Sequence, residues 1–299
     1  MSSTSRIADG IRAELAAAGL DPDDVESLIA RAVDEDLDGG VDVTTVATVP
    51  AGQRAVLDLV ARRAGVIAGV PVAAAVFSYV AGDAASITVV AKDGAAVKPG
   101  DVVLSVEGRT HDLLQAERPA LNLLGHLSGI ATLTGAWVEA IAGTSAAIRD
   151  TRKTTPGFRR LEKYAVRCGG GINHRMSLSD AALVKDNHVV AAGGVAAAFD
   201  AVRREFPGID VEVEVDSLDQ LDEVLDAGAD LVLLDNFTPE QMREAVRRTA
   251  GRARLEASGG LSIDVAAEVA ATGVDYLAVG ALTHSAPVLD IGADLRQES

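Results

Sequence analysis

The chain has 299 residues and a formal net charge of −17. Such acidity argues against a nucleic-acid partner, because proteins that bind nucleic acids usually present a broad basic face. No window approaches 18 apolar residues free of charge, and residues 1–10 lack the apolar core of a signal peptide. The single cysteine, Cys168, excludes an intrachain disulfide and a cysteine-based zinc site. We therefore expect a soluble, cytoplasmic protein without membrane contact.

The first segment with a clear pattern is helical. Apolar residues recur at helical spacing within residues 7–37, where Asp21 is placed as an N-cap and Pro22 occupies the first helical position. Hydrophobic residues make up 48% of the chain and aromatic residues only 3%. Small and β-branched side chains must therefore build the core, as in buried parallel strands flanked by alanine-rich helices.

Residues 54–109 change to short β segments separated by glycine and proline turns, with a helix predicted over 71–80. The stretch 97–108 is similar to the turn and strand of a lipoyl- or hammerhead-type β module. It lacks that module's lysine acceptor motif, so a small β-rich domain is the favoured interpretation. A long helical region follows over 111–141, in which Pro119 predicts a break or a first-turn position.

From about residue 145 short apolar strands alternate with amphipathic helices. The predicted strands lie within 146–153, 180–187, 211–217, 230–236, 253–260 and 275–284. The clearest helices are predicted over 195–207, 218–228, 239–250 and 263–273. This alternation predicts a parallel sheet, and the missing Gly-x-Gly-x-x-Gly turn argues against a dinucleotide-binding sheet. A (β/α) barrel is the better candidate, although it has six clear strands rather than eight.

Charged residues or glycines follow all six predicted strands, where barrel enzymes place their working residues. These residues are Arg152, Lys153, Lys185, Glu214, Asp235, Ser258–Gly260, Gly280 and His284. Alone, Lys185 is more simply a solvated strand end, Asp235 a helix cap and Ser258–Gly260 a plain turn. The recurrence at six successive strands favours a site. Glu212 and Glu214 are two apart on one strand, so both should face the barrel lumen or its upper mouth.

The stretch 148–175 holds eight Lys and Arg residues against two acidic ones. Arginine binds planar carboxylates in a bidentate way, whereas lysine acts as a point charge. The glycine-rich loops after the last two strands offer backbone N–H groups to a phosphate, and Glu214 and Asp235 suit Mg²⁺ or sugar hydroxyls. Together these features indicate that one site binds both carboxylates and phosphates.

Seven motifs resemble those of the quinolinate phosphoribosyltransferase family of NAD biosynthesis. They read "ERPALNLLGHLSGIATLT", "DTRKTTPGFR", "EKYAVRCGGGINHRMSLSDAALVKDNH", "VEVEVDS", "LLDNF", "LEASGG" and "GVDYLAVGALTHS". The resemblance implies an N-terminal α/β, hammerhead-like domain over 1–127 and an incomplete TIM-like α/β barrel over 128–299. It also implies a homodimer with shared active sites. The family joins quinolinate to phosphoribosyl pyrophosphate with Mg²⁺, giving nicotinate mononucleotide, pyrophosphate and CO₂.

The resemblance also implies roles for individual residues. Four are catalytic, namely Lys153, Lys185, Glu214 and Asp235. The substrate-binding set contains these four and Arg118, Thr151, Arg152, His174, Arg175, Ser258, Gly259, Gly260, Val279, Gly280, Ala281 and His284. In this pattern Arg118 reaches quinolinate from the neighbouring subunit, and Arg152, His174 and Arg175 hold its two carboxylates. Pro119 departs from the pattern, which has threonine or a similar residue there, but it leaves Arg118 in place.

Two other functions stay open at this point. The first is a decarboxylase or aldolase on a phosphosugar barrel, with Lys185 as a reactive amine. The second is a sensor that binds a phosphorylated metabolite without turnover. The favoured reaction needs no covalent nucleophile, so we expect Cys168 to be a packing residue rather than a catalyst.

Overall fold

The computed structural model describes residues 6–297, which form two compact units. The first unit comprises the chain up to Leu133, the segment Arg160–Gly169 and the chain from Ala286 onward. The second comprises Thr134–Arg159 and Gly170–Ser285. The chain therefore returns twice to its first unit, and the domain boundary between residues 127 and 128 stays a prediction. No helix within residues 6–297 is long and apolar enough to cross a membrane.

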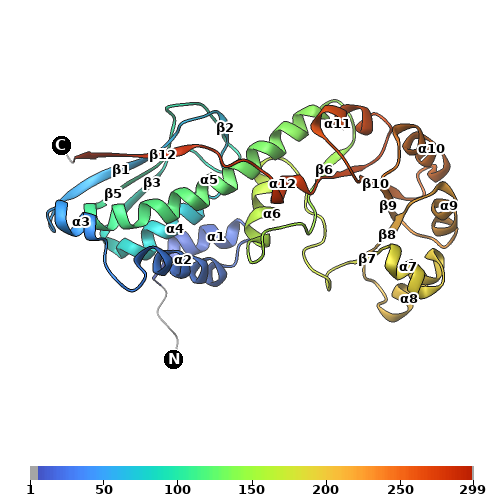
Figure 1. Ribbon diagram of the computed structural model, residues 1–299, viewed down its shortest axis with the longest axis horizontal. Coiled ribbons are helices and arrows are strands. Elements are labelled where there is room, and N and C mark those ends of the chain that lie inside the picture. The colour runs from blue at the N-terminus through green and yellow to red at the C-terminus, as the bar shows by residue number, and fades with distance from the viewer. Residues whose placement is uncertain (1–5, 298–299) are drawn as a thin grey trace. The chain divides into compact units, whose positions relative to one another are not determined.

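The first unit is built on an antiparallel sheet (Figure 1). Its strands in spatial order are β12 (Ile291–Gln297), β1 (Arg54–Ala61), β5 (Val102–Arg109) and β3 (Ser86–Val89). Two short strands, β2 (Gly65–Val66) and β4 (Ala96–Val97), form a separate pair. The β character predicted for 54–109 is thus confirmed. The pairing of β12 with β1 joins segments that lie more than 200 positions apart in the chain, which local sequence patterns do not reveal.

Helices accompany this sheet along the chain, and the one over residues 70–81 packs against β3 and β5. They are α1 (Asp9–Ala17), α2 (Pro22–Leu37), α3 (Val43–Thr48), α4 (Val70–Ala81), the 3₁₀ turn η1 (Gly82–Ala84), α5 (Thr110–Ala140) and α6 (Arg159–Cys168). The predicted cap of α2 is confirmed, since the Asp21 carboxylate accepts the backbone N–H groups of Asp23 and Asp24 at 2.9 and 3.4 Å. Such a cap contributes on the order of 1 kcal/mol to stability.

The predicted break at Pro119 is wrong, because α5 continues through it. Proline removes one backbone donor and crowds the preceding turn. Here the cost is outweighed by burial along the helix, where Ala116, Ala120 and Leu124 are fully buried. Gly129 lets this helix approach the last segment of the first unit, since a Cβ at that position would overlap the Pro287 carbonyl.

The second unit holds a six-stranded parallel sheet. Its spatial order is β6 (Ala147–Arg149), β11 (Tyr276–Ala278), β10 (Arg254–Ser258), β9 (Leu231–Asp235), β8 (Val211–Val215) and β7 (Ala182–Val184). β6, the first strand of this unit along the chain, pairs with β11, the last one, as the first and last strands of a closed barrel do. The sheet nevertheless stays open, because its edge strands β6 and β7 do not pair with each other. The six predicted strands and the incomplete barrel are therefore confirmed. Beside β6, Ile172 bridges Arg149 in parallel and brings the following residues to that edge.

Helices alternate with these strands and lie on their outer side (Figure 1). They are α7 (Asp186–Ala192), α8 (Val195–Glu205), α9 (Leu218–Asp226), α10 (Pro239–Thr249) and α11 (Ile263–Ala270). The single turn α12 (Ala281–His284) follows β11. The four helices predicted from amphipathic spacing correspond to α8, α9, α10 and α11. This arrangement brings the carboxyl ends of the strands, and the loops that follow them, to one edge of the sheet.

Candidate active site

Ten predicted site residues line one cavity of about 470 Å³ in the second unit. They are Thr151, Arg152, Lys153, His174, Arg175, Lys185, Glu214, Asp235, Ser258 and Gly259. The remaining lining residues are Leu183, Leu233, Asn236, Glu256 and Ala278. The predicted residues come from the ends of five strands and from the segment beside β6. The sequence therefore identified side chains that the fold brings to one place.

One side of the cavity is basic. The guanidinium of Arg175 donates to the Ala181 carbonyl at 2.9 Å, which fixes its direction. Burial and then the neighbouring Arg152 guanidinium lower the pKa of Arg175 from its ordinary value. Two converging arginines repel each other, and a bound anion removes that repulsion. This side of the cavity is thus arranged for carboxylates or phosphates.

The other side is acidic. Glu214 forms an ion pair with the Lys185 Nζ at 2.8 Å. The Asp235 carboxylate accepts a hydrogen bond from the Asn236 side chain at 2.8 Å. Both carboxylates also line an adjoining cavity of about 210 Å³. Its acidic residues are Asp186, Glu214, Asp216 and Asp235. Such a set of carboxylate oxygens has the chemistry that Mg²⁺ prefers.

Glycine-rich loops form a third side. A cavity of about 200 Å³ shares Thr151, Lys153, Ser258 and Gly259 with the main one. The other predicted residues that line it are Gly260, Val279, Gly280, Ala281 and His284. Gly259 has a φ of +94°, and a Cβ there would overlap the Asn236 side chain. Only glycine fits this turn, which leaves the backbone itself exposed to a ligand.

Arg118 is the predicted site residue that does not line these cavities. It lies in α5 of the first unit, with its side chain 62% exposed and 3.9 Å from Glu117. The resemblance assigns it to a neighbouring subunit's site, so its place within its own chain leaves that role a prediction.

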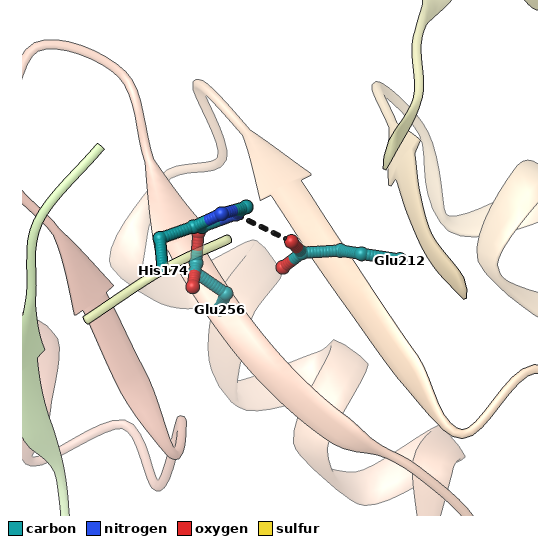
Figure 2. A group of neighbouring side chains, drawn as sticks. All are labelled: His174, Glu212 and Glu256. Carbon is teal, nitrogen blue, oxygen red and sulfur yellow. Dashed lines mark ion pairs between the residues drawn. The ribbon is translucent and has the colours of Figure 1, made fainter. Parts of the chain in front are cut away.

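A buried charged cluster forms part of the lining of the main cavity, and the predicted site included only its His174 (Figure 2). The His174 Nε2 lies 2.6 Å from Glu212 and 3.7 Å from Glu256. The Arg149 Nη1 lies 2.7 Å from Glu256 and 3.7 Å from Glu212. Glu212 and Glu256 are 3% and 0% exposed. Burial first, and then the Glu212 carboxylate, raise the pKa of Glu256 to about 8.

A signal for this cluster was present in the sequence. Glu212 and Glu256 each stand two residues before a cavity-lining residue on the same strand, and side chains two apart share one face. Arg149 ends β6 and likewise stands two residues before Thr151, which lines the cavity. This spacing predicts the inward direction of Glu212, and it indicates the same direction for Arg149 and Glu256, which are not among the predicted site residues.

The spacing of this cluster raises the question of a metal ion. One ligand atom each of His174, Glu212 and Glu256 lies within 4.8 Å of the others. However, Arg149 already supplies a cation within contact distance of both carboxylates. A divalent ion would face that guanidinium at close range in a buried space, where like charges repel strongly. The cluster is therefore an ion-pair network rather than a metal site.

Cys168 has no reactive environment. Burial first, and then the nearby Asp93 carboxylate, raise the pKa of its thiol to about 11. A thiol with that pKa stays protonated at neutral pH, whereas a nucleophile acts as the thiolate. This supports its interpretation as a packing residue.

Known proteins with similar sequences match nearly the whole chain. Residues 42–128 match the family model described as quinolinate phosphoribosyl transferase, N-terminal domain, and residues 130–294 match that of the C-terminal domain. The carboxylating nicotinate-nucleotide pyrophosphorylase of Mycobacterium leprae is 54% identical over 277 residues, which cover 91% of this chain and 98% of that protein. The chain belongs to the quinolinate phosphoribosyl transferase family.

Solved structures agree with this membership. The crystal structure of NadC from Streptococcus pyogenes aligns with a TM-score of 0.90 at 40% identity, covering 94% of this chain and 99% of that one. The nicotinate-nucleotide pyrophosphorylase of Francisella tularensis aligns with a TM-score of 0.88 at 36% identity, covering 92% and 96%. The resemblance that the motifs carried is therefore confirmed. So is the expected activity, a phosphoribosyltransferase reaction of NAD biosynthesis that uses quinolinate.

Proposed function

We propose that the main cavity and the two smaller ones beside it are the active site for this reaction. The observation that supports the proposal is their division into a basic, an acidic and a glycine-rich side. Quinolinate is a planar dicarboxylate, and phosphoribosyl pyrophosphate combines a sugar with phosphates. Each side of the site is thus chemically complementary to one part of the two substrates.

On the basic side, Arg152 and Arg175 hold the two carboxylates of quinolinate, with Thr151 and His174 next to them. Arginine pairs with planar carboxylates through two parallel N–H groups, which also fixes the orientation of the ring. Lys153 stands between quinolinate and the phosphates, since it lines both the main cavity and the glycine-rich one.

On the glycine-rich side, backbone N–H groups of Ser258–Gly260 and Val279–Ala281 bind phosphate oxygens, together with His284. The short distance between Gly280 and the Lys153 side chain favours this assignment, since a Cβ there would lie 2.9 Å from Lys153 Cδ. A phosphate on these loops would thus be held by amide dipoles and one ammonium group.

On the acidic side, Glu214 and Asp235 face the ribose. Departure of pyrophosphate leaves positive charge at the ribose C1, which a fixed carboxylate stabilises. The quinolinate nitrogen then forms a bond to C1 as the bond from C1 to the pyrophosphate oxygen breaks. The ring nitrogen becomes cationic and accepts the electrons of the C2–carboxylate bond, so that CO₂ leaves and a proton takes its place. Lys185, paired with Glu214, keeps that carboxylate in position.

Mg²⁺ fits the acidic side, whose four carboxylates supply the hard oxygen ligands that it prefers. Glu214 and Asp235 would hold it together with substrate oxygens, and it would neutralise charge on the pyrophosphate. We also propose that the enzyme acts in the cytoplasm, in keeping with its single cysteine. It acts there as a homodimer in which Arg118 completes the partner's site.

Turnover tests this proposal directly. Purified protein supplied with quinolinate, phosphoribosyl pyrophosphate and Mg²⁺ should release pyrophosphate and CO₂ in equal amounts, and chelation of Mg²⁺ should stop both. Nicotinate, which lacks the second carboxylate, should be a poor substrate because half of the basic side has no partner. Binding of both ligands without products would instead support a sensor. A borohydride-trapped adduct on Lys185 would support the Schiff-base alternative.

A complementation experiment tests the shared site. Arg118→Ala and Lys185→Ala homodimers should each be nearly inactive. If Arg118 acts across the dimer, a heterodimer of the two contains one site with neither substitution. It should then recover up to about half of the wild-type activity per dimer. Verified heterodimers without recovery would contradict a shared site.

A further inference from the structure

The buried charged cluster is one layer of the barrel interior. Such layers take side chains from alternate strands and are usually filled by bulky branched residues. Here Arg149, Glu256 and Glu212 come from β6, β10 and β8, the first, third and fifth strands in spatial order. The three side chains therefore come from alternate strands, as in a barrel layer, but all three are ionisable instead of apolar. Well-packed apolar residues at such positions are often at least as stable, so packing alone does not account for the charges.

Contacts with this layer and with Arg175 determine which nitrogen of the His174 ring carries the proton. The backbone N–H of Arg175 donates to His174 Nδ1 at 2.7 Å, so Nδ1 is an acceptor and carries no proton. The proton lies on Nε2, which donates to the Glu212 carboxylate at 2.6 Å. Both ring nitrogens are thus used within the protein, one toward the layer below and one toward the residue that follows.

His174 and Arg175 form a short link between the charged layer and the cavity. The segment has little regular structure of its own, and its backbone is held by Asp150, the residue after β6, which accepts the His174 N–H at 2.8 Å. The His174 ring adds a second attachment, which runs from Glu212 to the Arg175 amide. The ring therefore fixes the backbone from which the Arg175 side chain starts, while the Ala181 carbonyl holds its guanidinium.

The charges of the layer are not fully matched. Arg149 pairs with both carboxylates through the same Nη1, and Oε1 of Glu212 and Oε1 of Glu256 have no hydrogen-bond partner within residues 6–297. Burial of unsatisfied carboxylate oxygens costs stability. Buried polar groups that lower stability in this way are found most often at functional sites.

We propose that Glu212, paired with Arg149, which Glu256 in turn orients, is a positioning residue for quinolinate: it fixes the His174 ring, and the ring fixes the Arg175 backbone. This rests on the proposed binding of quinolinate by Arg175. His174 then acts through its neighbour's backbone rather than as a donor to the substrate. The layer sets the affinity for the dicarboxylate and leaves the phosphoribosyl side of the site unaffected.

Steady-state kinetics of Glu212→Leu and Glu212→Gln test the proposal. Leucine has a similar volume but cannot accept a hydrogen bond from the Nε2–H of His174. The KM for quinolinate should therefore rise about 10-fold, the equivalent of one charge-assisted hydrogen bond. The kcat and the KM for phosphoribosyl pyrophosphate should change less than about 3-fold. Glutamine keeps an acceptor oxygen and should restore KM to within about 3-fold of the wild type.

Glu162→Leu is the matched control. Glu162 is also fully buried and lies 3.0 Å from a histidine, His126, but it does not line the cavity. This variant should lower Tm without changing the KM for quinolinate. If Glu212→Leu fails to fold, His174→Asn replaces it, because asparagine keeps an acceptor for the Arg175 amide but is too short to reach Glu212. It should give the same rise in KM.

Three outcomes would overturn the proposal. They are an unchanged KM in both Glu212→Leu and His174→Asn, an equal loss in Glu212→Gln and Glu212→Leu, and an equal rise of the two substrates' KM values. Arg175→Ala separates these failures from a failure of the proposed site. If it leaves the KM for quinolinate unchanged, the assignment of Arg175 is wrong. If it raises that KM while Glu212→Leu does not, only the positioning role is wrong.

Discussion

Two buried polar networks in this chain differ in how completely their charges are satisfied. In the first unit Asp93 accepts the Val70 backbone N–H at 2.9 Å through one oxygen and the Tyr164 hydroxyl through the other. In the second unit Glu212 and Glu256 each keep an oxygen without a hydrogen-bond partner. Burial raises the pKa of both Asp93 and Glu256, and hydrogen bonds counteract the rise at Asp93.

The difference separates a structural network from a functional one. Asp93 holds the start of α4 and contacts α6, so it fixes elements that are far apart in the sequence. A fully satisfied network of this kind makes one packing arrangement specific. The charged layer instead joins strands that the backbone ladder already holds together. Its unsatisfied oxygens are therefore better explained by what lies above them in the cavity.

The largest expected effect is that of Arg149→Met. It leaves the buried Glu212 carboxylate and the Glu256 carboxyl group without their cation, and breaking a buried ion pair in this way costs about 3–5 kcal/mol. Urea denaturation should show that loss in the free energy of unfolding. The triple variant Arg149→Met, Glu212→Leu, Glu256→Leu should regain most of the stability yet bind quinolinate weakly. A single variant as stable as the wild type would contradict the view that the layer is a coupled network.

The pH dependence of stability distinguishes Glu256 from its neighbours. Its pKa is about 8 in the folded protein against an ordinary value of 4.5, so the folded state binds the proton more tightly. Its contribution to stability is complete below about pH 4.5 and is lost as pH rises toward 8. Glu256→Gln cannot titrate, so the wild type should lose stability relative to it by up to about 1.4 kcal/mol per pH unit. Parallel stability curves between pH 5.5 and 7.5 would refute the raised pKa.

The sequence predicted the second unit better than the first for a physical reason. Strand and helix alternate there at short range, so each element is recognisable from its own residues, and parallel order then places the strand ends together. Lys185 and Asp235 could therefore be assigned to one site although 50 positions separate them in the chain. The family resemblance supplied their roles, which the spacing alone did not.

What the sequence did not predict depends on contacts between distant segments. The pairing of β12 with β1 and the continuation of α5 through Pro119 are both decided by burial in the folded unit. Glu256 and Arg149 were missed for a different reason. Each is a single charge in a short apolar strand, and only the assembled layer shows that they face the same partner.

The smallest expected effect is that of Tyr164→Phe, which removes one hydrogen bond from Asp93 and leaves the ring in place. The loss should be about 1 kcal/mol in the free energy of unfolding, or a few degrees in Tm, since Asp93 keeps the Val70 amide. The KM values of both substrates should stay within about 2-fold of the wild type, because neither Tyr164 nor Asp93 lines the cavity. A rise in the KM for quinolinate alone would mean that the first unit also tunes the basic side of the site. The Asp93 network would then not be purely structural, and the contrast with the charged layer would be wrong.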